Sequence, residues 1–269
     1  MIDKSRLISI KIRQKVLSLL EGKHRIIKFG EEDDLKNIRE YTYGDNVKRI
    51  NWIITAKEKK PYVVEREELK SQNIVICLFV DQEFLFKNKL EKMAEVYSII
   101  AYSAMYQKDR LYTYIFSSGV EMEVIHRNNI STVQQVLDHL FKIKLKEKRL
   151  NFENFHRKVL SHRRSLLVLI GDFFYDIDLI PVTSKHKPVI IKIRDRDEEN
   201  PEKYTGYQLR SFDGKRKIPY LVPPMVKTYK KNLSEIDEKL RQFAVLNRIP
   251  IRTIYTDEDP FVKLRLLFS

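Results

Sequence analysis

Cysteine and glycine are both scarce in this 269-residue sequence, which contains one cysteine and seven glycines. The single cysteine, Cys77, excludes a disulfide framework, a thiolate metal cluster and a CxxC redox pair. None of the glycines forms a GxGxxG turn or a phosphate-binding P-loop. The HExxH and GxSxG motifs are also missing, and the six histidines do not pair at ligand spacing on one helix. These absences favour a protein that is not an enzyme.

Long hydrophobic runs are missing as well. No stretch of about 18 apolar residues is present to cross a bilayer. The first residues, Met1 to Arg6, lack the apolar core of a signal peptide. We therefore expect a cytoplasmic protein without membrane insertion.

Charge of one sign predominates, with a formal net charge of +14. Such an excess invites a nucleic-acid interpretation, but the basic residues are spread along the chain and no zinc-finger spacing or aromatic RNP-type strand accompanies them. We expect basic faces that are solvated surface rather than a nucleic-acid site. A polyanion binder stays the alternative, and it would use the locally dense basic residues Lys144, Lys148, Arg157 and Arg163.

The stretch from Asn73 to Asp81 is an apolar run that ends on a carboxylate. Residues 74–80 show no alternation of polar and apolar residues, so both faces of this strand must be covered, as in the centre of a parallel sheet. A second apolar stretch, 165–170, ends in Gly171 and Asp172. Because ligands gather beyond the carboxyl ends of parallel strands, we expect Asp81 and Asp172 at the same sheet edge. The alternative role of Asp81 is to cap the following helix.

Helical and strand patterns alternate along the rest of the chain. The sequence predicts helices over 5–20, 88–107, 131–146, 151–160 and 226–247 and from about 259. It predicts strands over 61–67, 111–116, 120–125, 188–193 and 249–255, with a hairpin formed by 207–212 and 217–222. This order indicates an α/β fold with a doubly wound, mostly parallel sheet and helices on both faces.

Residues 38–52, IREYTYGDNVKRINW, form the most distinctive segment. Gly44, Asp45 and Asn46 are a turn signal, and Asp45 or Asn46 is predicted to cap a short helix that carries Val47, Ile50 and Trp52. Charged residues flank this turn at a spacing that predicts ion pairs, namely Arg39, Glu40, Asp45 and Arg49. The residue types and their spacing favour a charged, aromatic loop that braces the structure.

The pattern LxxIREYxxGDxVxRINW, beginning at Leu35, resembles the signature of the DUF58 family. The family comprises bacterial proteins with a von Willebrand factor A-like fold that are typically encoded beside MoxR-type AAA ATPases. The resemblance implies an N-terminal extension over 1–70, with a helix and β structure, and a von Willebrand factor A-like domain over 71–269. It also implies a MoxR-type ATPase as partner and marks a candidate docking segment made of Arg39, Glu40, Tyr41, Gly44, Asp45, Arg49 and Trp52.

The von Willebrand factor A fold holds a divalent cation with an Asp-x-Ser-x-Ser motif, a threonine and a second aspartate. In this sequence the Asp-x-Ser-x-Ser positions hold Asp81, Glu83 and Leu85. The threonine position holds Asn151, and the position of the second aspartate holds Asp172. Leucine cannot coordinate a metal, and the hydroxyl ligands that suit magnesium are missing. The resemblance therefore implies a degenerate metal site, and we expect no cofactor, with Mg²⁺ as the alternative.

Two functions follow from this sequence. The first is a non-enzymatic scaffold that works with a MoxR-type ATPase in the maturation or remodelling of a client complex. The second is a polyanion binder or a metal-dependent phosphoesterase. The phosphoesterase would use Asp81, Glu83, Asp172 and Asp176.

Overall fold

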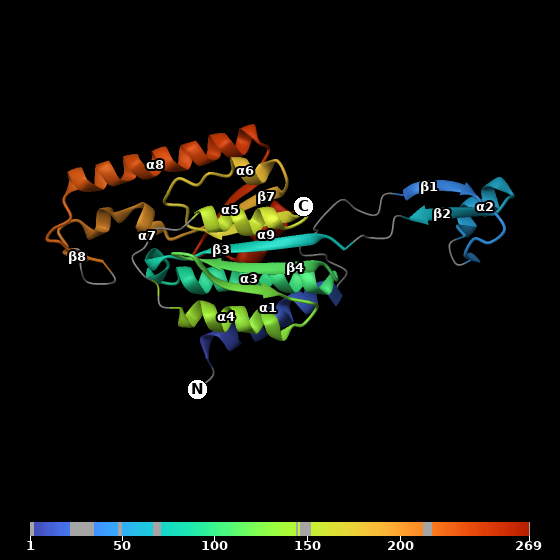
Figure 1. The fold of residues 1–269 in the computed structure, drawn as a ribbon, viewed down its shortest axis with the longest axis horizontal. Coiled ribbons are helices and arrows are strands. Elements are labelled where there is room, and N and C mark those ends of the chain that lie inside the picture. Colours follow the sequence, from blue (N-terminus) through green and yellow to red (C-terminus); the bar gives the residue numbers. More distant parts are fainter. Residues whose placement is uncertain are drawn as a thin grey trace. The chain divides into compact units, whose positions relative to one another are not determined.

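The computed structural model describes residues 3–21, 35–47, 50–66, 71–143, 145, 152–211 and 217–268 (Figure 1). The chain divides into two compact units. The larger unit consists of residues 1–27 and 73–269, and the smaller unit of residues 28–72. The N-terminal helix, α1 (Lys4–Glu21), is thus part of the larger unit, where it packs against α3 (Lys89–Tyr106) and α4 (Ser131–Lys142).

A six-stranded sheet in the order β10-β7-β6-β3-β4-β5 forms the centre of the larger unit. All neighbouring strands run parallel except β5, which pairs with β4 in antiparallel fashion. The prediction of an α/β fold with a mostly parallel sheet is confirmed. The strands are β3 (Asn73–Phe79), β4 (Arg110–Phe116), β5 (Val120–Ile125), β6 (Leu166–Gly171), β7 (Lys187–Arg194) and β10 (Ile251–Tyr255).

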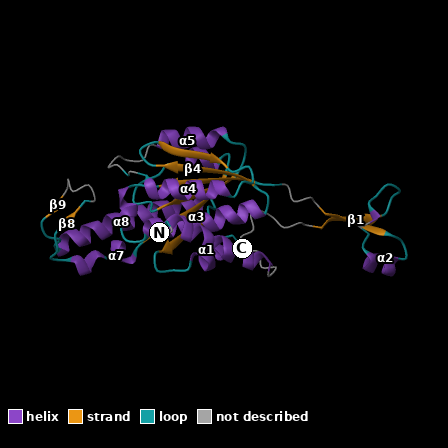
Figure 2. Cartoon of the chain, turned by 90° about the horizontal axis from the view of Figure 1, so that it is seen from below, coloured by secondary structure: helices purple, strands orange, loops and turns teal. Residues whose placement is uncertain are grey.

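The central position of β3 explains its unbroken apolar sequence. It pairs with β4 on one side and β6 on the other, and Leu78 has no exposed surface. Val75, Cys77 and Phe79 belong to a core cluster that also contains buried side chains of α5 (Phe152–Ser161), α6 (Ile180–Thr183) and α8 (Pro223–Leu246). Side chains alternate along a strand, so Ile74, Ile76 and Leu78 face the opposite layer, which contains α3. Figures 1 and 2 show helices on both faces of the sheet.

Several elements differ from their predicted bounds. Helix α4 ends at Lys142 because Ile143 is already extended, with ψ at 131°. Helix α8 begins earlier than predicted, at Pro223, since proline fits the first turn of a helix, where the missing N–H has no partner to lose. The predicted hairpin is reduced to β8 (Leu209–Arg210) and β9 (Lys217–Ile218). Helix α9 (Pro260–Leu267) ends the described chain.

Two short elements after β7 were not predicted. Helix α7 (Arg196–Glu199) is capped by Asp195, whose side chain accepts a hydrogen bond from the Asp197 N–H, and the 3₁₀ helix η3 (Pro201–Tyr204) follows.

The smaller unit contains an antiparallel pair of strands, β1 (Leu35–Glu40) and β2 (Tyr62–Arg66), and helix α2 (Trp52–Glu58). The sequence predicted one short helix with Val47, Ile50 and Trp52, capped by Asp45 or Asn46; in the structure Trp52 begins α2, and Ile50 forms an isolated bridge with Val63. Asn51 caps α2 instead, because its side chain accepts hydrogen bonds from the Ile53 and Ile54 N–H groups. The Asp45 carboxylate is bound to Arg39, with the two groups 2.7 Å apart.

Candidate functional site

Three carboxylates meet at the carboxyl edge of the sheet. Asp81 follows β3, Asp172 follows β6, and Glu83 lies in η2 (Gln82–Leu85), the 3₁₀ helix just after β3. One carboxylate oxygen from each residue lies within 4.8 Å of the others. Asp172 is completely buried, Asp81 is half-buried and Glu83 is exposed. We call these residues, Asp81, Glu83 and Asp172, the carboxylate cluster.

Local structure explains how the cluster forms. The Asp81 side chain accepts a hydrogen bond of 3.0 Å from the Glu83 N–H and so caps η2, which turns Glu83 back towards the sheet edge. Phe84 anchors the same turn in the interior. Asp172 is preceded by Gly171, where a Cβ atom would stand only 3.2 Å from the Phe79 Cβ. Asp81 therefore has both roles that the sequence suggested: it caps the following helix, and it belongs to the cluster.

A buried lysine lies behind the cluster. The Lys89 ammonium is 3.0 Å from Asp172 Oδ2 and 2.8 Å from Glu198 Oε1, and its side chain has no exposed surface. The rings of Phe84 and Phe174 lie 4.9 Å from the same nitrogen. Burial opposes a charge on this amine, but the Asp172 and Glu198 carboxylates outweigh it and raise the pKa of Lys89. Lys89 therefore carries a permanent positive charge beside Asp172.

A buried arginine fixes the backbone around Asp172. Arg194, the last residue of β7, donates from Nε to the Asp172 carbonyl at 2.5 Å and from Nη2 to the Phe173 carbonyl at 3.3 Å. Its guanidinium stacks on the Phe174 ring at 3.9 Å and pairs with Asp237 of α8 at 3.0 Å. Arg194 thus ties the ends of β6 and β7 to α8.

Acidic groups outnumber cations in this region, and their pKa values show the consequence. Burial and the negative charges of Asp172 and Glu83 raise the pKa of Asp81 to about 8. The Glu83 side chain is exposed as a whole, but its carboxylate lies against Asp81 and Asp172, where reduced hydration and the charge of Asp172 raise its pKa. Burial raises the pKa of Glu198 to about 7. Each of these carboxyls is therefore easier to protonate than a solvated one, first because hydration is lost and then, for Asp81 and Glu83, because of neighbouring negative charge.

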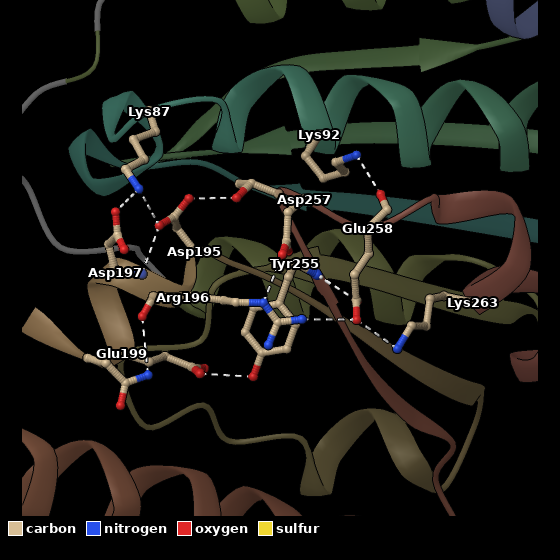
Figure 3. A network of polar contacts seen from close by, with 12 residues as sticks. Lys87, Lys92, Asp195, Arg196, Asp197, Glu199, Tyr255, Asp257, Glu258 and Lys263 are labelled. Carbon is tan, nitrogen blue, oxygen red and sulfur yellow. Dashed lines mark hydrogen bonds and ion pairs between the residues drawn. The ribbon is translucent and has the colours of Figure 1, made fainter.

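A polar network joins the loops beside the cluster (Figure 3). Lys87 binds Asp195 and Asp197, and Arg196 pairs with Asp257 at 2.9 Å while its guanidinium stacks on Tyr255. Thr256 donates to Asp195 and Lys92 donates to the Glu258 carbonyl. Loops that follow β3, β7 and β10 are fastened together in this way, so the sheet edge is a rigid support.

Sequence reasoning missed Lys89, Arg194 and Glu198. Arg194 and Glu198 lie in a run of charged residues that resembles a solvated loop, and Lys89 lies in the first turn of a helix with basic neighbours. One signal was available: Arg194 ends an apolar strand, where a charged residue reaches the same edge as Asp81 and Asp172.

The residues at this edge do not match a magnesium site. Lys89 is bonded to Asp172, and Leu85 is 45% exposed and offers no ligand atom. Asn151, the fourth predicted ligand, lies outside the described residues. Asp176, which the phosphoesterase hypothesis included, pairs with Lys239 of α8 at 3.6 Å. The described residues at the motif positions are three carboxylates and a leucine, so the serine hydroxyls of the motif are absent and water would have to complete an octahedral Mg²⁺ shell.

We expect millimolar Mg²⁺ or Mn²⁺ to raise the melting temperature little. A site filled at 100 times its dissociation constant would add about 2.7 kcal/mol to the free energy of unfolding. Thermal melting with and without the metal measures this. A clear upward shift that Asp81→Asn abolishes would contradict the expectation and would favour the phosphoesterase.

The signature residues lie in the smaller unit. Arg39 pairs with Asp45, and Glu40 with Lys60 at 2.9 Å. Gly44 has a φ of +107°, a backbone conformation that other residues rarely adopt, which explains the glycine in the turn. Trp52 is 67% exposed, and Tyr41 is half-buried. Arg49 lies outside the described residues.

A family model described as "Protein of unknown function DUF58" matches residues 37–210. No curated protein matches the chain. Among solved structures, the chain is similar to the crystal structure of an uncharacterized membrane spanning protein from Vibrio fischeri, with 14% sequence identity and a TM-score of 0.24. That similarity covers 65% of this chain and 99% of the other. Among the described helices, none combines the length and the apolar character needed to cross a membrane.

Proposed function

The chain belongs to the DUF58 family, and we propose that it is a non-enzymatic interaction protein that works with a MoxR-type AAA ATPase. The description of the family states no function. The partner comes from the resemblance of residues 35–52 to a family whose members are typically encoded beside such ATPases. In this proposal the protein acts in the cytoplasm and helps the ATPase to mature or remodel a client complex.

The buried pair of Lys89 and Asp172 is the observation that carries the proposal. In the related fold this edge holds a metal through a carboxylate at the position of Asp172. Here an internal ammonium lies 3.0 Å from that carboxylate, and a network of loops holds the edge rigid. A rigid polar edge that presents Asp81 and Glu83 to solvent is suited to binding a protein partner.

The smaller unit supports the proposal independently. Its exposed side chains include Trp52 and Ile53, which are 67% and 74% exposed, at the start of α2. Tryptophan and arginine are the residue types most often found at the energetic centre of protein interfaces. We therefore assign two contact regions to the partner, the carboxylate cluster and the exposed start of α2.

We expect the double variant Asp81→Ala with Glu83→Ala to weaken association with the purified MoxR-type ATPase of the native host while the fold stays intact. The variant removes two solvent-facing acids and leaves the buried Asp172 and Lys89 in place. Biolayer interferometry measures the association, and circular dichroism checks the fold. Association that is unchanged in the double variant would exclude the carboxylate cluster as the contact.

The close approach of three carboxylates, within 4.8 Å, is the observation that favours the alternative metal-dependent phosphoesterase, whereas a polyanion binder would use basic residues instead. Polyanion binding would fall steeply with salt, with a slope of about one per phosphate contacted. It would also depend on Arg157 and Arg163, and on Lys144 and Lys148, which lie outside the described residues.

We expect the protein to stay bound to the ATPase at moderate salt concentration, and we expect DNA and RNA to bind only weakly at the same concentration. Titrations at several salt concentrations measure both. Nanomolar nucleic-acid binding at physiological salt, lost on replacing these four basic residues, would reject the scaffold in favour of the polyanion binder.

A further inference from the structure

The carboxylate cluster and its surroundings contain buried polar atoms that have no hydrogen-bond partner among the described residues. Asp172 Oδ1 is buried and has no hydrogen-bond partner among the described residues, although Oδ2 of the same carboxylate is bound to Lys89. Glu198 Oε2 and the Tyr175 hydroxyl oxygen are also buried without a hydrogen-bond partner in the described part of the chain. Burial raises the pKa of Tyr175, and the charges of Asp172, Asp81 and Glu83 raise it further. Buried polar atoms are almost always satisfied, so these atoms can accept hydrogen bonds from a donor that reaches the cluster.

The nearby described cations are already engaged. Lys87 is bound to Asp195 and Asp197, and Arg196 is bound to Asp257 and Glu258 (Figure 3). Lys263 pairs with Glu258 at 3.0 Å. Lys89 is therefore the ammonium that serves Asp172 and Glu198. The second buried cation, Arg194, donates to the Asp172 and Phe173 carbonyls and pairs with Asp237, and among the described residues no cation forms an ion pair with Asp81 or Glu83.

Solvent can reach the cluster from the side of η2. Glu83 is exposed and Asp81 is half-buried, whereas Asp172 lies behind them without any exposed surface. Leu85, on the same short helix, is 45% exposed and offers an apolar surface next to the acids. A ligand with a long apolar stem and a cationic head would match this arrangement.

We propose that the carboxylate cluster receives the guanidinium of an arginine side chain from the protein partner. This inference rests on the proposed function and names the chemistry of the contact. A guanidinium has five donors in a flat fork and no acceptor, which suits several carboxylate oxygens that diverge from one point. Lysine fits less well, because its ammonium is a compact point charge that cannot span several carboxylate oxygens as the flat guanidinium fork does.

The test uses nuclear magnetic resonance on the ¹⁵N-labelled full chain with three blocked tripeptides, Ala-Arg-Ala, Ala-Lys-Ala and Ala-citrulline-Ala. Citrulline keeps the shape of arginine without its charge. We expect the arginine peptide to move the backbone amide signals of Glu83 and Phe84 saturably, the lysine peptide to bind several-fold more weakly, and the citrulline peptide to leave them unchanged.

Two variants make the test specific. Asp81→Asn with Glu83→Gln keeps the shapes and removes two carboxyls that can ionise when a cation binds, and we expect at least about a tenfold loss of affinity, since hydrogen bonds to charged groups contribute about 1.5–3 kcal/mol. Asp176→Asn is the matched control. It removes an exposed acid that pairs with Lys239, and we expect it to leave peptide binding unchanged.

Three results would overturn the inference. The first is the absence of any saturable change with the arginine peptide. The second is that Mg²⁺ moves the same signals and displaces the peptide, which would make the ligand a metal. The third is that the peptide binds only after Lys146, Lys148 and Arg149 are replaced by alanine, which would make this chain's own basic segment the occupant. If the inference fails while the ATPase still associates, the proposed function stands with a different contact.

Discussion

Replacing Lys89 by methionine should lower the free energy of unfolding by about 3–5 kcal/mol, the cost of leaving one partner of a buried ion pair without its counter-charge. Methionine keeps much of the volume of lysine, so the loss reports the charge. In the native protein the ammonium is fully buried between Asp172 and Glu198. Urea unfolding followed by circular dichroism measures the change.

Two further variants separate the charge from simple packing. Lys89→Met combined with Asp172→Asn removes both charges and should regain part of the lost stability. Lys158→Met is the control, because its pair with Glu123 is partly exposed and should contribute at most about 1 kcal/mol. If Lys89→Met and Lys158→Met cost the same, Lys89 does not act as the buried counter-charge of the cluster.

Replacing Leu78 by aspartate should prevent stable folding. Leu78 lies in the middle of β3, between β4 and β6, and has no exposed surface. An unpaired charge buried there costs several kcal/mol, against a total stability of roughly 5–15 kcal/mol for a typical domain. Leu7→Asp is the control, since Leu7 is 51% exposed on α1 and an acid in the first turn of a helix is tolerated.

Solubility and thermal melting of the two variants measure the difference. A soluble Leu78→Asp protein that melts cooperatively at the temperature of the unsubstituted protein would show that β3 does not form the centre of the core.

The fold could be predicted because strands that are buried on both faces of a sheet have unbroken apolar sequences. The apolar runs of β3, β6 and β7 predicted a parallel sheet, and the structure has these strands as neighbours. The approach of Asp81 and Asp172 followed from the same argument, since parallel neighbours end at one edge.

The partners of the cluster could not be predicted in this way. A lysine in the first turn of a helix and an arginine before a charged loop look like surface residues in any periodicity analysis. Only the packing of α3 and α7 against the sheet edge makes Lys89 and Glu198 buried partners. The start of the helix near Trp52 was misplaced for a similar reason, because Asp45 and Asn51 are both residue types that cap helices. In the structure Asp45 is bound to Arg39, and Asn51 caps α2.

The central claim is that the protein works by binding a MoxR-type ATPase through the carboxylate cluster. Crosslinking in the native host, followed by pull-down of the tagged full chain and mass spectrometry, tests it most directly. The account predicts that the ATPase is recovered with the unsubstituted protein and strongly depleted with the Asp81→Ala and Glu83→Ala double variant. Recovery of nucleic acid without any ATPase, or equal recovery of the ATPase with both proteins, would contradict it.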